Sequence, residues 1–191
     1  MLDIALFPLN TVLFPGGLLP LRIFEARYVD MVGRCMRADD VFGVVLVLGG
    51  SDTDREVKTA SIGTSARIVD FQTLEDGLLG ILCRGERRFR VLARRLQDDG
   101  LNCASVEWMP AVERAVVAAE YQPLVPLLRR ALAQLTTIGR FIEPDYEDAS
   151  WVGHRLAELL PLDQSLQQQL LEIDDPNTRL SLLAPLIEVR Q

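Results

Sequence analysis

The chain has 191 residues, of which 49% are hydrophobic and 25% are charged, a composition typical of a folded globular protein and not of a disordered one. The formal net charge of −7 disfavours non-specific binding to nucleic acid or to an anionic membrane surface, because both require positive charge on the protein. No two of the three cysteines, Cys35, Cys83 and Cys103, form a Cys-x-x-Cys pair, which argues against a disulfide scaffold and against a structural zinc site. We expect reduced core thiols and a cytoplasmic protein.

The N-terminal stretch 4–21 has no charged residue and so resembles a membrane span. Pro8, Pro15 and Pro20 interrupt it, and a helix would not run through them. No basic residue precedes the stretch, so we do not expect a secretory signal. The pattern indicates short strands with tight turns, over residues 3–7, 11–14 and 18–24.

A helix is predicted next, because Tyr28, Met31, Val32, Cys35 and Met36 share one helical face. We expect Asp39-Asp40 to end it. The apolar run 41–48 then predicts a strand buried on both faces, followed by a polar loop over 49–58.

Three longer strand-like segments follow: 62–74, 78–96 and 101–108, the second passing through Gly85. Asp76-Gly77 and Asp99-Gly100 separate them, and Asp-Gly between strand patterns is a strong hairpin signal. The pattern predicts an antiparallel sheet that curls on itself.

After Pro110 the periodicity becomes helical. We expect helices over 124–138 and 151–160, a third capped by Asp163, and a fourth opened by Asp175-Pro176 that Pro185 should kink or end. The fold class is therefore α+β, with a β-rich part with one helix over residues 1–112 and a helical part over 113–191.

Four motifs carry a resemblance to a known family. The first is the opening stretch LFPLNTVLFPGGLLPLRIFEARYVDMV, residues 6–32. The others are IGTSARI at 62–68, GERRFRV at 85–91, and the LLPL…LLE…D…RL pattern between 159 and 180. In this order they resemble the N-terminal domain of the Lon protease family.

The resemblance implies a PUA-like β pseudobarrel followed by a helical subdomain. It also implies a non-catalytic domain that takes part in substrate recognition, with unfolded or flexible polypeptide segments or a dedicated protein as partner, and with weak self-association. The ATPase of the family needs a Walker A loop, whereas the only lysine here is Lys58, outside any such loop. We therefore expect no enzyme, no cofactor, no metal and no membrane partner.

Candidate groups for chemistry are few. His154, the only histidine, could act as a general base, but a packing or surface histidine is the simpler interpretation. Asp52, Asp54 and Glu56 could hold a cation, yet they lack the spacing of an EF-hand, so we favour a solvated loop. A hydrolase with an unrecognised cleft between the two parts remains the enzymatic alternative.

The basic cluster supports the other alternative, a PUA-like RNA-binding protein. It comprises Arg84, Arg87, Arg88, Arg90, Arg94 and Arg95. Alternation along a strand would divide these arginines between two faces, and no aromatic ladder interleaves them, so we do not expect a nucleic-acid partner.

The predicted binding surface is the strand-turn-helix corner made by Phe14, Arg22, Phe24, Glu25, Arg27 and Tyr28. Polar groups beside apolar ones suit an extended, partly apolar peptide. The alternative is that the aromatic residues belong to the core, and that Arg22 pairs with Glu25 to tie the strand to the helix.

Overall fold

The computed structural model describes residues 2–49, 58–135 and 137–188. The chain divides into two compact units, Met1–Pro110 and Ala111–Gln191, which we call the barrel unit and the helical unit. Each is described by itself.

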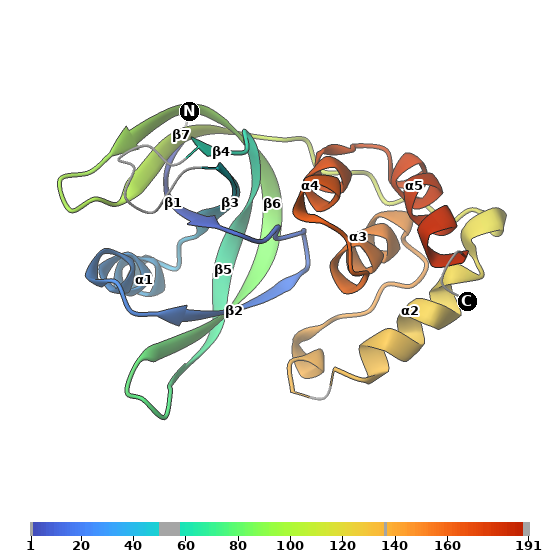
Figure 1. Cartoon of the computed structure of the whole chain (residues 1–191), viewed down its shortest axis with the longest axis horizontal. Helices are drawn as coiled ribbons and strands as arrows, with labels where there is room; N and C mark the ends of the chain where they lie inside the picture. Colours follow the sequence, from blue (N-terminus) through green and yellow to red (C-terminus); the bar gives the residue numbers. More distant parts are fainter. Residues whose placement is uncertain (1, 50–57, 136, 189–191) are drawn as a thin grey trace. The chain divides into compact units, whose positions relative to one another are not determined.

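Among the described residues, the barrel unit holds every strand and one long helix, α1 (Figure 1). The elements are β1 (Leu2–Leu9), β2 (Leu18–Ile23), α1 (Ala26–Ala38), β3 (Phe42–Gly49), β4 (Lys58–Thr59), β5 (Ile62–Thr73), β6 (Leu79–Leu96) and β7 (Asn102–Trp108). Five strands form a ring in the order β1-β7-β6-β5-β3, and β3 pairs again with β1. This closed ring followed by helices confirms the predicted α+β class with a pseudobarrel.

The closure of the ring differs from the prediction in one respect. The antiparallel pairing predicted for the later strands is confirmed in β5, β6 and β7, but β1 and β3 run parallel, with Leu6 opposite Gly43 and Leu9 opposite Leu46, which the sequence did not predict. A parallel pair needs a long crossover between its strands, and here β2 and α1 supply it. Closing the ring removes open edges from most of the sheet.

Two apolar clusters lie on opposite faces of the strands. In β1, Leu6 belongs to one cluster with Val45 and Phe89, whereas the next residue, Phe7, belongs to the other. The second cluster includes the apolar face of α1, where the ring of Tyr28 stacks on that of Phe7 with centroids 4.0 Å apart. The predicted helix is confirmed, and Asp39 ends it in the left-handed conformation with φ 49°.

The strand predicted over residues 11–14 is wrong, because this buried segment has no regular structure. Its neighbours Gly16 and Gly17 instead exchange backbone hydrogen bonds with Gly85 of β6, at 2.7 and 2.9 Å. The segment therefore crosses β6 at one point and does not pair along it.

Both Asp-Gly hairpins are confirmed, and they have the same geometry. In the first, the N–H of Gly77 donates to the carbonyl of Leu74 at 2.9 Å, and the N–H of Leu74 donates to that of Leu78 at 2.8 Å. Gly77 has φ 83° and Gly100, at the same place in the second hairpin, has φ 81°. A three-residue loop needs this left-handed residue, which explains the glycine in each.

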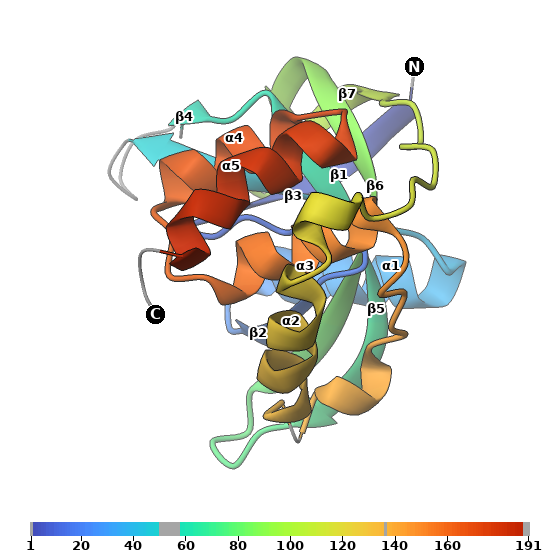
Figure 2. The same cartoon turned by 90° about the vertical axis from the view of Figure 1, so that its right-hand side faces the viewer.

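The helical unit contains α2 (Leu124–Ala133), α3 (Ala149–Leu159), α4 (Gln164–Glu172) and α5 (Pro176–Glu188), with the short 3₁₀ helices η1 (Ala119–Tyr121) and η2 (Gly139–Phe141). α3 contacts each of the other three helices (Figure 2). Asp148, Asp163 and Asp175 each accept backbone N–H bonds at the start of a helix, and the capping roles predicted for the last two are confirmed.

The ends of two helices can be compared with the prediction. α2 ends at Ala133 and not at Ile138, because the N–H groups of Gln134 and Leu135 turn to carbonyls three residues back, which tightens and closes the last turn. Of the two outcomes predicted for Pro185, a kink or an end of the helix, the end does not occur, because α5 continues to Glu188.

A buried arginine connects the last two helices. Arg179 on α5 is fully buried, and its guanidinium donates to the carbonyl O of Leu170, at 2.9 Å, and to that of Ile173. These carbonyls lie at the C-terminal end of α4, where helical carbonyls have no partner within the helix. The Arg-Leu end of the fourth sequence motif therefore anchors α5 to α4.

Within the described residues, no helix is both long enough and apolar enough to span a membrane.

Candidate functional site

The site lies where β2, β6 and β5 run side by side and form a three-stranded arm of the barrel unit. Ile23 on β2 is opposite Leu79 on β6, which is opposite Thr73 on β5. In Figure 1 the β5–β6 hairpin that belongs to this arm projects past β2. Residues opposite each other on antiparallel strands share a face, so the arm presents one row of side chains to α1.

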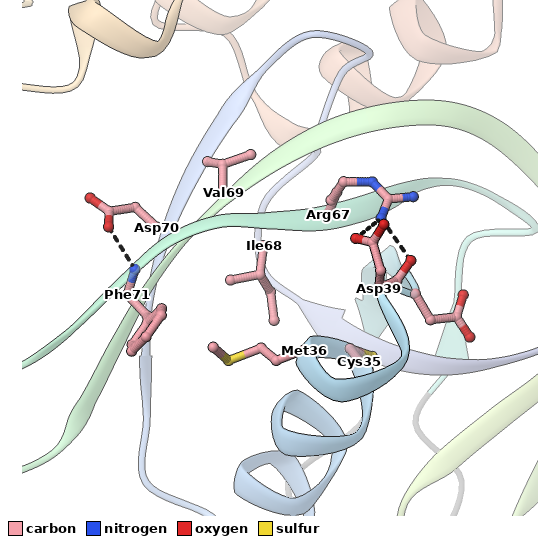
Figure 3. Close-up of a pocket in the computed structure, with 9 residues that line it drawn as sticks. Cys35, Met36, Asp39, Arg67, Ile68, Val69, Asp70 and Phe71 are labelled. Carbon is pink, nitrogen blue, oxygen red and sulfur yellow. Dashed lines mark hydrogen bonds and ion pairs between the residues drawn. The ribbon is translucent and has the colours of Figure 1, made fainter.

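A groove runs between the C-terminal half of α1 and β5 (Figure 3). Its volume is about 230 Å³, and its lining is Cys35, Met36, Asp39, Asp40, Arg67, Ile68, Val69, Asp70 and Phe71. Met36, Ile68 and Phe71 converge in it, and Phe71 lies opposite the buried Ile81 of β6. Phe71 is nevertheless 58% exposed and Met36 41% exposed, so the apolar floor faces solvent.

Charged groups occupy both ends of the groove. At one end, Nη1 of Arg67 donates to the carboxylate of Asp39 at 2.7 Å, and Nε of Arg67 donates to Glu86 at 2.5 Å. The hydrogen bond that Arg67 donates to Glu86 raises the pKa of Arg67 above its ordinary value, and the attraction of the Glu86 and Asp39 carboxylates adds to this shift. At the other end, Asp70 accepts a bond from the N–H of Phe71 at 2.9 Å.

Two of the six predicted binding residues are buried. Phe14 is fully buried, and Tyr28 lies on the buried face of α1, in the core. Neither side chain can contact a ligand without a rearrangement of the core. Burial also raises the pKa of the Tyr28 hydroxyl.

The other four predicted residues lie at the surface or are half-buried. Phe24 is 69% exposed directly after β2. The predicted pairing of Arg22 with Glu25 is wrong: Arg22 pairs with Asp76 in the hairpin loop, and Glu25 pairs with Arg27 at 2.5 Å. The register explains this, since Arg22 lies opposite Gly80, beside the loop that carries Asp76. Arg27 donates to the carbonyl of Gly100 at 2.7 Å, so its guanidinium is tied to the second hairpin.

The three cysteines are free and buried, as predicted. Burial raises the pKa of Cys83 to about 12. Burial also raises the pKa of Cys35, with a further contribution from the charge of Asp40. A thiol that stays protonated is a poor nucleophile, so Cys35 contributes apolar surface to the groove and no reactivity.

His154 is buried in α3, in agreement with the packing role expected for it. The predicted acidic loop with Asp52, Asp54 and Glu56 lies outside the described residues. Among the residues that are described, no group of three His, Cys, Asp or Glu side chains is placed to hold a metal ion.

The arginines of the basic cluster are divided, as strand alternation predicts. Arg88 is buried, whereas Arg87 stacks over the ring of Trp108 at 5.0 Å. Arg94 donates to the carbonyls of Thr59 and Ala60, and Arg95 pairs with Asp3 at 3.1 Å. These side chains stabilise the barrel unit and do not form one phosphate-facing row.

A second hollow, of about 350 Å³, is lined by Leu2, Leu92, Val106, Glu107 and Trp108. It is larger than the groove, but the ring of Trp108 already contacts Arg87 and Phe89. Only one of its lining residues is charged, so the hollow offers little to orient a ligand.

Comparison with known proteins identifies the family. The sequence profile of the ATP-dependent protease La (LON) substrate-binding domain matches residues 3–189. A Lon protease from Cytophaga hutchinsonii is 24% identical over 187 residues, which is 94% of this chain and 23% of that protein. The chain therefore spans under a quarter of the length of this relative.

Two solved structures share the fold. A Lon N-terminal domain protein from Xanthomonas campestris is 39% identical, with a TM-score of 0.80 over 97% of this chain and 98% of that one. The N-terminal domain of a Mycobacterium avium complex Lon protease is 20% identical, with a TM-score of 0.62 over 95% of each chain. The predicted resemblance is thus confirmed, and this chain belongs to the family of Lon substrate-binding domains.

Proposed function

We propose that this chain is a non-catalytic binding domain that recognises unfolded or flexible segments of other polypeptides. Membership of the Lon substrate-binding domain family supports the class of partner. The single observation that carries the proposal is the exposed apolar floor of the groove, because a monomeric surface seldom leaves large apolar side chains together in a hollow without a ligand for them.

The absence of catalysis is part of the proposal. The groove contains carboxylates, a guanidinium and a buried thiol, and the pKa of that thiol is raised above its ordinary value. Hydrolysis would need a nucleophile within reach of a general base. His154, the only histidine, is buried in α3 of the helical unit.

The predicted corner contributes to the same surface in this proposal. Phe24 follows Ile23, and the row Ile23, Leu79 and Thr73 places it at the end of the arm where β5 ends. A polypeptide that lies along β5 can therefore extend towards Phe24, with Arg22, Glu25 and Arg27 nearby in sequence. Phe14 and Tyr28 support this corner from the core and are not proposed as contacts.

Fluorescence anisotropy of the intact chain tests the proposal. The probe is a labelled disulfide-bonded protein, used once in its folded form and once after reduction and alkylation, at two salt concentrations. We expect the unfolded form alone to bind, with a Kd on the order of micromolar that survives the higher salt. Absence of binding to the unfolded form at about 100 micromolar chain would contradict the proposal.

A further inference from the structure

One edge of β5 is open along the groove. β5 pairs with β3 only from Thr64 to Ala66, but with β6 as far as Thr73. Within residues 2–49, 58–135 and 137–188, no strand therefore pairs with the second edge of β5 from Arg67 to Thr73. Backbone N–H and C=O groups on such an edge can bind another extended chain.

The groove lies beside this same edge. Ile68 and Phe71 are opposite Cys83 and Ile81, and so their side chains face α1, where Met36 completes the apolar floor. A strand added to β5 would direct every second side chain to this face. Backbone pairing and a pocket for alternate side chains are the two features that peptide recognition by strand addition uses.

The charges beside the edge select the kind of segment. Three carboxylates line the groove, those of Asp39, Asp40 and Asp70, against one guanidinium. That guanidinium, of Arg67, is shared between Asp39 and Glu86. The side chain of Asp39 is 95% exposed, so a cation can approach it from solvent. The groove thus favours a basic side chain.

We propose that an extended segment of a client polypeptide, rich in apolar and basic residues, pairs as an added strand with β5 from Arg67 to Thr73. An apolar side chain of the segment packs on Met36, Ile68 and Phe71, and a lysine or arginine lies beside Asp39 and Asp40. This inference rests on the proposed function and specifies its binding mode.

The N–H of Phe71 has a particular place in this mode. It donates to the carboxylate of Asp70, the residue before it, and so is capped locally in the free protein. A local cap of this kind protects an edge from non-specific pairing. In the complex the N–H turns to a carbonyl of the added strand, and the Asp70 carboxylate pairs with a basic side chain.

The first test changes only the peptide. A labelled valine-lysine peptide, in which valine and lysine alternate at every second position and serine fills the positions between, is compared with the same peptide N-methylated at alternate residues, and with one in which glutamate replaces lysine. N-methylation removes backbone donors but keeps the side chains. We expect the intact chain to bind the first peptide at least about tenfold more tightly than either of the others, because several hydrogen bonds or ion pairs are lost.

The second test changes the protein. Phe71→Pro removes both the ring and the N–H, whereas Phe71→Ala removes the ring alone. We expect Phe71→Pro to bind the valine-lysine peptide about fivefold more weakly than Phe71→Ala, the effect of one net hydrogen bond.

The double variant Asp39→Asn, Asp40→Asn tests the charges of the groove, and it should weaken binding severalfold at low salt and less at high salt. Leu92→Ala, an exposed apolar residue of the second hollow, is the matched control and should bind as the parent does.

The possible outcomes separate the two proposals. If the chain binds unfolded polypeptide, but N-methylation and the Phe71 variants change nothing, strand addition is wrong and the general function stands. If it binds no polypeptide, both proposals fail. Should Phe71→Pro lack the circular dichroism of the parent, the N-methylated peptide still decides, since that comparison needs no variant.

Discussion

Glycine at position 85 illustrates how a single residue fixes the path of the barrel unit. A Cβ atom there would lie 2.2 Å from the carbonyl oxygen of Phe14, which is backbone and cannot move aside without displacing the crossing segment. Gly85, in the motif at 85–91, thus allows the backbone of the opening motif at 6–32 to approach β6 closely. Neither motif alone reveals this contact, since it joins residues about seventy positions apart in sequence.

We predict that Gly85→Ala destabilises the protein by about 2 kcal/mol or more, the range of steric overpacking. Gly33→Ala in the middle of α1 is the matched control, because its added Cβ meets only the end of Arg37, at 3.4 Å. Since alanine is the better helix former, this control should be neutral or gain up to about 1 kcal/mol. Urea denaturation measures both, and equal stabilities for the two variants would contradict the account of Gly85.

Arg179 fixes the helical unit in a comparable way. Replacing it by methionine leaves the carbonyls of Leu170 and Ile173 without this donor and should cost about 3 kcal/mol. Lysine should not restore the stability, because a single ammonium lacks the planar fork that reaches both carbonyls. Arg130→Met, an exposed position on α2, should change stability by less than about 0.5 kcal/mol. Wild-type stability of Arg179→Lys in a urea titration would show that the fork is not needed.

At the scale of elements, the cap of α5 gives a prediction about pH. The N–H of Thr178 donates to the Asp175 carboxylate at 2.6 Å, and this bond holds the pKa of Asp175 below its ordinary value of 3.8. A depressed folded-state pKa means that the cap stabilises the fold fully above the unfolded value. That stability is lost as pH falls below 3.8 towards the folded pKa.

Asp175→Asn should keep the capping hydrogen bond, but its side chain has no ionisable group. We therefore expect the midpoint of thermal unfolding to fall less in this variant than in the parent between pH 5 and pH 3, the range around the unfolded pKa. Asp175→Ala, which has no cap at any pH, should be less stable than both at neutral pH. Identical pH profiles for the parent and Asp175→Asn would mean that this carboxylate does not contribute to the acid sensitivity.

Most elements could be predicted from the sequence because their signals are local. The Asp-Gly pairs, the cap residues Asp163 and Asp175, and the apolar face of α1 each depend on neighbours a few positions away. The prediction of a strand over 11–14 was wrong because the apolar residues of this segment reflect its burial and not strand pairing. The parallel closure of β1 on β3 was missed since strand pairing between distant segments leaves no trace in local periodicity.

The groove was also missed, although the sequence held one signal for it. The segment 62–74 predicts a strand much longer than that of its partner 41–48, so part of the longer strand must lack a partner on one edge. Met36 was assigned to the buried face of α1 but lies at the rim of that face, 41% exposed. In the predicted binding corner, Phe14 and Tyr28 are buried. Their burial depends on tertiary packing, which the periodicity of the sequence alone does not reveal.

At the scale of the whole molecule, the two units provide a test of the division predicted at residue 112. Each unit has its own apolar contacts and one of the two tryptophans, Trp108 in the barrel unit and Trp151 in α3. Trp108→Phe leaves a reporter of the helical unit, and Trp151→Phe leaves a reporter of the barrel unit.

We predict that adding Arg179→Met lowers the unfolding midpoint reported by Trp151 and leaves that reported by Trp108 nearly unchanged. The reason is that the bonds lost lie wholly within the helical unit. Equal shifts of both fluorescence transitions would indicate one cooperative domain and contradict the division into two folding units.

The central claim, that the chain binds extended polypeptide along β5, is tested most directly by amide hydrogen exchange. The intact chain is compared with and without saturating reduced and alkylated polypeptide. The account predicts new protection concentrated in residues 67–73, at the open edge of β5. Protection confined to the helical unit, or to β1 and β7 around the second hollow, would contradict it.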